Sequence, residues 1–160
     1  MIFVTIGSMF PFDRLVRRMD EVAAATPEET FFAQVGEGGF EPAHMAYARM
    51  LSRTDFMAKL RAAKLLVAHA GMGSIISAME VGVPIVVLPR QARWGEVNTD
   101  HQVATARWLE GRPDMHVCFE DEDLPAVVAA ALKARRPDAV VDRTAPKAFT
   151  DKIAQFIAAA

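Results

Sequence analysis

The sequence predicts an α/β fold in which a parallel sheet is flanked by helices. Three observations favour this class. Short apolar runs alternate with longer segments of helical periodicity along the whole chain. A glycine-rich turn at 69–74 directly follows one such run and precedes a helix-like segment at 75–81, and a second buried-looking run follows at 84–88. Continuous apolar runs of this kind are typical of strands that are covered on both faces of a parallel sheet.

Length, charge and cysteine content limit the class of protein. A chain of 160 residues fits one domain, and its net charge of −2 gives no electrostatic case for nucleic-acid binding. The single cysteine, Cys118, excludes an internal disulfide and fits a reducing compartment. No apolar run approaches the ~18 residues of a spanning helix, and the N-terminus reads as a strand and not as a secretion signal. We expect one cytoplasmic domain over residues 1–160.

The N-terminal elements follow from local patterns. Residues 2–6 form a β-branched strand that ends at Gly7-Ser8. Pro11 opens a segment whose apolar residues recur at helical spacing as far as position 23. A second strand is expected at 30–35, where glycines close it. The segment 45–51 fits a short strand and a helical turn equally well.

The remaining elements continue the alternation of strands and helices. Thr54 and Asp121 are suitable N-caps for two of the helices. A final amphipathic helix from about Pro146 packs its apolar face either on the domain's own core or on a partner. That face carries Phe149, Ile153, Phe156 and Ile157. The elements expected between position 54 and this helix are a helix at 54–63, a strand at 65–68, a helix at 74–81, a strand at 84–88, a helix at 98–110, a strand at 115–119 and a helix at 121–135.

A ligand site is expected at the carboxyl edge of the sheet. In open parallel sheets, ligands lie beyond the carboxyl ends of the strands, where Gly7-Ser8 and the loops at 36–40, 69–74 and 89–98 gather. A strand, a glycine-rich turn and a helix start form an anion site, because the N–H groups of the first helical turn point toward the ligand. The turn at 69–74 therefore predicts binding of a negatively charged group.

Three motifs occur together in this chain. They are His69-Ala70-Gly71-Met72-Gly73-Ser74, Pro89-Arg90 with Gly95-Glu96, and Asp100-His101-Gln102. With these motifs the chain resembles the glycosyltransferase family 28 C-terminal domain, the donor-binding half of GT-B glycosyltransferases. It is most similar to stand-alone donor subunits of split transferases, which act in bacterial capsule and exopolysaccharide assembly or on dolichol in eukaryotes. The resemblance implies a Rossmann-like sheet that forms the C-terminal half of a GT-B fold.

The resemblance also implies roles for individual residues. His69, Gly71, Gly73 and Ser74 would hold the diphosphate of a UDP-sugar, and the cluster near Gln102 would bind the hydroxyls of the donor sugar. No metal or other cofactor is expected, and no catalytic residue is identified. The expected substrate-binding residues are Gly7, Ser8, His69, Ala70, Gly71, Met72, Gly73, Ser74, Ser77, Glu80, Arg90, Glu96, Asp100, His101 and Gln102.

The sequence departs from the superfamily pattern at one position. The superfamily usually carries a glutamate three residues after the serine of the turn, where it holds the ribose hydroxyls. Here Ser77 takes that position, and the nearest carboxylate is Glu80, one helical turn further on. Either Ser77 makes the ribose contact alone, or Glu80 reaches toward it, or the nucleoside is held differently.

The expected function is the donor-binding subunit of an inverting UDP-sugar-dependent glycosyltransferase. Its partner would be a membrane-anchored subunit that presents a lipid-linked saccharide and recruits this chain to the cytosolic face of the membrane. The donor sugar stays open among glucuronic acid, galactose and GlcNAc, and Arg90 with Arg93 slightly favours an acidic sugar. The alternatives are a non-catalytic UDP-sugar-binding or regulatory module and a nucleotide-sugar epimerase or hydrolase.

Overall fold

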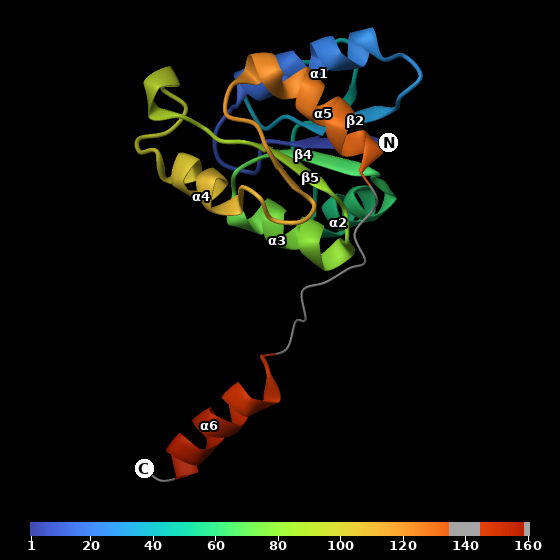
Figure 1. Ribbon diagram of the computed structural model, residues 1–160. Coiled ribbons are helices and arrows are strands. Elements are labelled where there is room, and N and C mark those ends of the chain that lie inside the picture. Colours follow the sequence, from blue (N-terminus) through green and yellow to red (C-terminus); the bar gives the residue numbers. More distant parts are fainter. Residues whose placement is uncertain (135–144, 159–160) are drawn as a thin grey trace.

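A parallel sheet forms the centre of the molecule. The computed structural model describes residues 1–134 and 145–158, and within these residues six strands lie in the order β3-β2-β1-β4-β5-β6 (Figure 1). All neighbouring strands are parallel, which confirms the predicted class. The strands are β1 (Ile2–Thr5), β2 (Phe31–Gln34), β3 (Ala46–Ala48), β4 (Leu65–His69), β5 (Ile85–Leu88) and β6 (Met115–Val117). The ambiguous segment 45–51 thus contains an edge strand.

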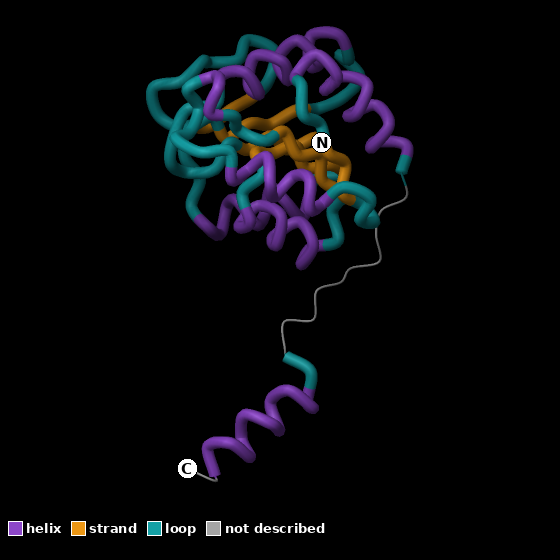
Figure 2. Tube along the Cα trace, turned by 60° about the vertical axis from the view of Figure 1, so that its left-hand side comes forward, coloured by secondary structure: helices purple, strands orange, loops and turns teal. Residues whose placement is uncertain are grey.

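Helices cover both faces of the sheet (Figures 1 and 2). Helices α1 (Asp13–Ala25) and α5 (Leu124–Lys133) lie on one face and contact each other. Helices α2 (Arg53–Ala62), α3 (Met72–Val81) and α4 (His101–Leu109) lie on the other. Two short 3-10 turns, η1 (Ala92–Trp94) and η2 (Asp121–Asp123), and a helix near the C-terminus, α6 (Lys147–Ala158), complete the described elements.

Two apolar cores hold these layers together. One core packs α1 and α5 on the sheet through buried side chains such as Leu15, Met19 and Val128. The other packs α2, α3 and α4 on the opposite face through Leu60, Ile75 and Leu109. Every residue of β1 and β5 is buried, because both faces of these central strands are covered. The stiff, β-branched side chains of these runs suit this environment.

Two predicted N-caps are wrong. Helix α2 is capped by Ser52, whose hydroxyl accepts a hydrogen bond from the Asp55 amide at 3.1 Å, and Thr54 lies inside the helix. Asp121 does not cap a helix either, because its carboxylate contacts Arg14 and Arg18 of α1. A capping side chain and an ion-pairing side chain look alike in sequence, since both are short and polar.

Some predicted boundaries shift. The helix predicted at 98–110 begins only at His101, because residues 95–100 form a turn after η1. The helix predicted at 74–81 begins at Met72. The helix predicted at 121–135 begins at Leu124 after η2 and ends at Lys133, and its predicted end, Arg135, lies outside the described residues.

The C-terminal amphipathic helix forms as predicted, but its apolar face is exposed. None of the side chains of α6 is buried, and Phe156 is 79% exposed. The helix therefore does not pack on the domain's own core, which was one of its two predicted interpretations. In the described part of the chain, no helix is both long and apolar enough to cross a membrane.

Candidate functional site

A cavity of about 740 Å³ opens at the carboxyl edge of the sheet. Its size falls in the range of small-molecule sites. The strand order places the topological switch point between β1 and β4, which is where ligands bind in sheets of this kind. Thr5 pairs in register with Gln34 of β2 and Ala68 of β4, so these strands end together beneath the cavity. The predicted residues that line it are Gly7, Ser8, His69, Gly73, Ser74, Ser77, Arg90, His101 and Gln102.

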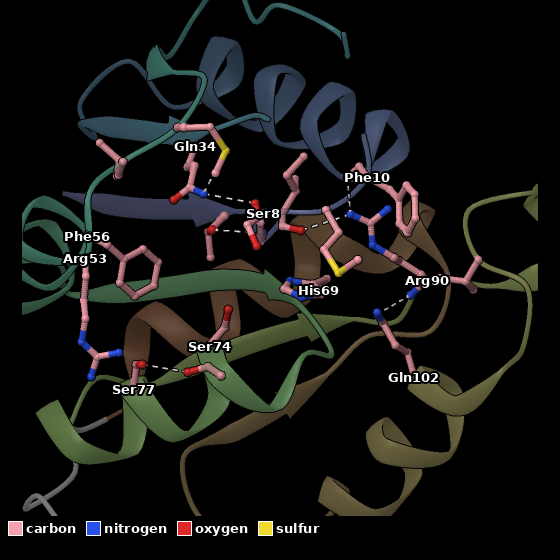
Figure 3. A pocket seen from close by; sticks show the side chains of 18 of the residues that line it. Ser8, Phe10, Gln34, Arg53, Phe56, His69, Ser74, Ser77, Arg90 and Gln102 are labelled. Carbon is pink, nitrogen blue, oxygen red and sulfur yellow. Dashed lines mark hydrogen bonds between the residues drawn. The ribbon is translucent and has the colours of Figure 1, made fainter. Parts of the chain in front are cut away.

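His69 lies at the middle of the cavity wall, where β4 ends (Figure 3). Its ring is held between two glycines. A Cβ on Gly7 would come within 2.7 Å of the His69 Cε1 atom, and a Cβ on Gly71 would also collide with the ring. Gly7 has in addition a φ of +79°, which disfavours any other residue. These two glycines therefore make room for the imidazole, whereas both of them were expected from the sequence to bind the substrate.

The His69 imidazole is neutral at physiological pH. Burial, together with the positive charge of Arg90, lowers its pKa to about 4, against a smaller opposing effect of a hydrogen bond with the Thr5 backbone. Its Nδ1 atom is buried and has no hydrogen-bond partner in the described structure. A buried nitrogen without a partner is costly to the fold.

His69 predicts a specific pH dependence of stability. Because its pKa is lower in the folded protein than its ordinary value of 6.5, the unfolded chain takes up the proton first as the pH falls. The free energy of unfolding should therefore fall by about 3 kcal/mol as the pH drops from above 6.5 to below 4. Urea denaturation of wild type and His69→Gln at several pH values measures this. If His69→Gln keeps the full pH dependence of stability between pH 6.5 and 4, His69 is not its cause.

The N-terminus of α3 faces the cavity through Gly73 and Ser74. Gly71 occupies the N-cap position and no side chain caps the helix. The Ser74 amide donates to the Gly71 carbonyl at 3.1 Å, so the amides of Met72 and Gly73 are the ones that stay available to a ligand. A Cβ on Gly73 would meet no atom within 4 Å, so this glycine borders open space. Ser77, one turn later, also lines the cavity, and its hydroxyl donates to the Gly73 carbonyl at 2.7 Å.

Six of the expected binding residues do not line the cavity. Ala70 is buried in the core, and Gly71 and Met72 only begin the helix. Glu80 lies away from the cavity wall. The carboxylate of Glu96 accepts two hydrogen bonds from Arg14 and one from the Gln91 amide. Asp100 accepts a hydrogen bond from the Ala92 amide at 2.8 Å. The last two carboxylates thus shape the loop after β5.

Gln102 borders one end of the cavity, near Arg90 (Figure 3), and its neighbour in the chain, His101, also lines the cavity. The side-chain oxygen of Gln102 accepts a hydrogen bond from the Arg90 amide at 3.1 Å. This bond fixes the orientation of the Gln102 amide and leaves its nitrogen to donate to a ligand. His101 is exposed and its Nδ1 atom lies 2.9 Å from the Thr99 hydroxyl.

The opposite end of the cavity, where Arg53 and Phe56 of α2 lie (Figure 3), was not predicted from the sequence. Met50 and Leu51, which precede α2, also line the cavity. Gln34, whose amide donates to the Gly7 carbonyl at 3.1 Å, was not predicted either. A polar residue at the carboxyl end of a buried strand was a usable signal for Gln34. Arg53 gave no signal, because it lies beside a segment whose structure was ambiguous.

The cavity is suited to an anion. None of the described residues that line it is an aspartate or a glutamate. Its lining includes four basic side chains, those of Arg53, Arg90, His69 and His101. The side chain of Arg53 takes part in none of the hydrogen bonds or ion pairs found among the described residues, so its guanidinium is available. Among those same residues, no group of three or more potential metal ligands comes together. The site therefore combines helix amides, the available guanidinium of Arg53 and an apolar end.

A protein-family model matches almost the whole chain. The model described as the glycosyltransferase family 28 C-terminal domain matches residues 1–158. The chain belongs to this family. The comparison with curated proteins gave no match.

Solved structures similar to this family 28 domain share its fold. The glycotransferase of kitacinnamycin matches with a TM-score of 0.65 and 22% identity over 83% of this chain and 35% of its own. MurG of Acinetobacter baumannii matches with a TM-score of 0.60 and 20% identity over 100% of this chain and 50% of its own. CalG4, the calicheamicin glycosyltransferase, matches with a TM-score of 0.60 and 17% identity over 86% and 34%. The chain thus spans a third to a half of the length of these proteins.

Proposed function

We propose that this chain binds the UDP-sugar donor of an inverting glycosyltransferase. The observation that carries the proposal is the open cavity at the N-terminus of α3, which Gly73 and Ser74 border and which no carboxylate of the described residues lines. A diphosphate in this position accepts hydrogen bonds from the helix amides and neutralises the positive potential of the cavity. Membership of family 28 supports a nucleotide sugar as the source of that diphosphate.

The shape of the cavity orients the donor. With the diphosphate at α3, the end formed by Gln102 and His101 offers hydrogen-bonding groups to the sugar, and the apolar end at Phe56 takes the flat base. The ribose then lies beside Ser77 and Arg53. Ser77 borders the cavity and Glu80 does not, so the geometry favours Ser77 for the ribose contact.

The positions of Arg90 and Arg93 in the structure do not favour an acidic donor sugar. Arg93 does not line the cavity, and it forms an ion pair with Glu120. Arg90 lines the cavity, but its guanidinium is bonded to backbone carbonyls. Glucuronic acid, galactose and GlcNAc are therefore equal candidates.

A second, membrane-anchored subunit would supply the acceptor. Two apolar surfaces support this part of the proposal. The cavity mouth exposes Met9, Phe10 and Met50, and α6 exposes its apolar face. Exposed apolar surface of this kind marks sites of protein contact. Since the similar structures are two to three times longer than this chain, the partner would take the place of their remaining half.

The proposed chemistry is direct displacement at the anomeric carbon. A hydroxyl of a lipid-linked saccharide, held by the partner at the cytosolic face of the membrane, attacks as UDP leaves. The amides of α3 stabilise the charge that grows on the departing diphosphate, and the proposal requires no metal. The base that deprotonates the acceptor would come from the partner, so this chain alone should bind donor without turnover.

A thermal-shift panel tests donor binding. The purified chain is heated with UDP, UDP-glucuronic acid, UDP-galactose or UDP-GlcNAc, and with GDP and NAD as controls. A ligand at a hundred times its dissociation constant adds about 2.7 kcal/mol, which raises the midpoint by several degrees. We expect a shift with uridine compounds only, and the largest shift names the donor. No shift, with and without the partner, would contradict the proposal.

Turnover separates the transferase from a non-catalytic module. The chain mixed with its partner and a lipid-linked saccharide should release UDP and extend the acceptor, whereas neither protein alone should do so. UDP-sugar binding without transfer by the complex would favour the regulatory module.

A further inference from the structure

Arg90 is a buried cation directly after β5. Its side chain is 3% exposed and reaches across the carboxyl edge of the sheet to the segment Ile6–Pro11, between β1 and α1. Its guanidinium donates to three backbone carbonyls of that segment: those of Pro11 at 2.6 Å, Phe10 at 2.6 Å and Ile6 at 3.1 Å. The guanidinium also lies over the Phe12 ring, 4.6 Å from its centroid.

These contacts require the geometry of arginine. A planar fork with five N–H groups reaches three carbonyls at once, whereas a lysine ammonium is a compact point charge that cannot span them. None of the hydrogen bonds that Arg90 makes with the described residues goes to a carboxylate. Arg90 is therefore committed to the backbone, and its donors are directed at Ile6, Phe10 and Pro11 instead of a ligand.

The segment Ile6–Pro11, which Arg90 holds, forms the centre of the cavity wall. Gly7 and Ser8 lie within this segment and line the cavity, and Gly7 packs against the His69 ring so closely that it has no room for a Cβ. On the other side, the backbone amide of Arg90 donates to Gln102 at 3.1 Å. One residue thus joins the β1–α1 loop, the end of β5 and the start of α4 (Figure 3).

We propose that Arg90 is a positioning residue. It holds the segment Ile6–Pro11, the β1–α1 loop, against His69 and so fixes the middle of the cavity for its ligand. This role rests on the proposed function for the identity of the ligand, but the contacts themselves exist without it. It replaces the direct substrate contact that was expected for Arg90 from the sequence. Loss of the guanidinium fork should release the loop and weaken ligand binding through Gly7 and His69.

Two substitutions test this role. Arg90→Lys keeps the charge and loses the fork, and Arg90→Met loses both. Arg93→Met is the matched control, because Arg93 is exposed and lies outside the cavity. For each protein, calorimetry gives the dissociation constant for UDP well below the thermal midpoint, and ¹H–¹⁵N spectra without ligand give the amide resonances of Gly7, Ser8 and Phe10.

We expect both Arg90 variants to weaken UDP binding at least tenfold and to shift these loop amides in the ligand-free protein, while Arg93→Met changes neither. Arg90→Lys decides the matter, because it keeps the charge even if Arg90→Met fails to fold. Wild-type affinity in Arg90→Lys, or unmoved loop amides in a folded variant, would overturn the proposal. If wild type binds no UDP either alone or with its partner, the proposed function fails, and the loop amides still test the positioning role.

Discussion

Gly73→Val is expected to abolish UDP binding while it leaves the fold intact. A Cβ at this position enters open space and meets no atom within 4 Å, so the branch point of the valine side chain fits without a clash. Valine also has a higher helix propensity than glycine. The added methyl groups occupy the space beside the first turn of α3 that the diphosphate needs. We expect calorimetry to show at least a hundredfold weaker UDP binding and a thermal midpoint at or above that of wild type.

Two further variants calibrate this result. Gly73→Ala adds a single methyl group and should weaken UDP binding by an intermediate factor. Met72→Val changes the preceding, exposed residue of the same helix, which does not line the cavity, and should bind UDP as wild type does. A folded Gly73→Val protein with unchanged UDP affinity would remove the diphosphate from the N-terminus of α3.

Arg53→Glu is expected to have the second largest effect on binding. Arg53 is the available cation at the base end of the cavity, and no carboxylate lines that cavity among the described residues. A glutamate there replaces attraction of the anionic ligand by repulsion. The fold should tolerate it, because an acidic residue in the first turn of α2 interacts favourably with the helix dipole. We expect at least tenfold weaker UDP binding at low salt, with a smaller difference at 1 M salt.

Arg61→Glu provides the matched control for this charge reversal. Arg61 lies on the same helix, is exposed and does not line the cavity. It changes the net charge of the protein by the same amount, so it separates a local effect from a general one. If both variants weaken UDP binding equally, Arg53 has no direct role in the site.

The fold was predictable from sequence because its central strands are buried on both faces. The runs at 65–68 and 84–88 are continuously apolar, and the chain between them is just long enough for one helix. The errors lie where tertiary contacts decide between equal local options. Asp121 is a plausible cap by composition, but Arg14 and Arg18 draw its carboxylate to α1.

The site was predictable where the backbone itself makes it. The turn at 69–74 places His69, Gly73 and Ser74 on the cavity wall because a strand end and a helix start have a fixed geometry. Side chains that approach from other elements were not predictable in this way. Arg90 and Glu96 belong to one of the three motifs and were expected to bind the substrate, yet both hold loops. Glu96 pairs with Arg14, and Arg90 donates to backbone carbonyls between β1 and α1. Arg53 reaches the cavity from α2, far from any motif.

The most direct test of the central claim is a titration of ¹⁵N-labelled protein with UDP, followed by ¹H–¹⁵N spectra. We expect the largest amide shifts to cluster at Met72, Gly73 and Ser74, with smaller ones at Gly7 and Ser8, and the amides of α5 and α6 to stay unchanged. A UDP-sugar in place of UDP should add shifts at His101 and Gln102. Shifts that cluster away from the carboxyl edge of the sheet, with the α3 amides unmoved at saturation, would contradict the central claim.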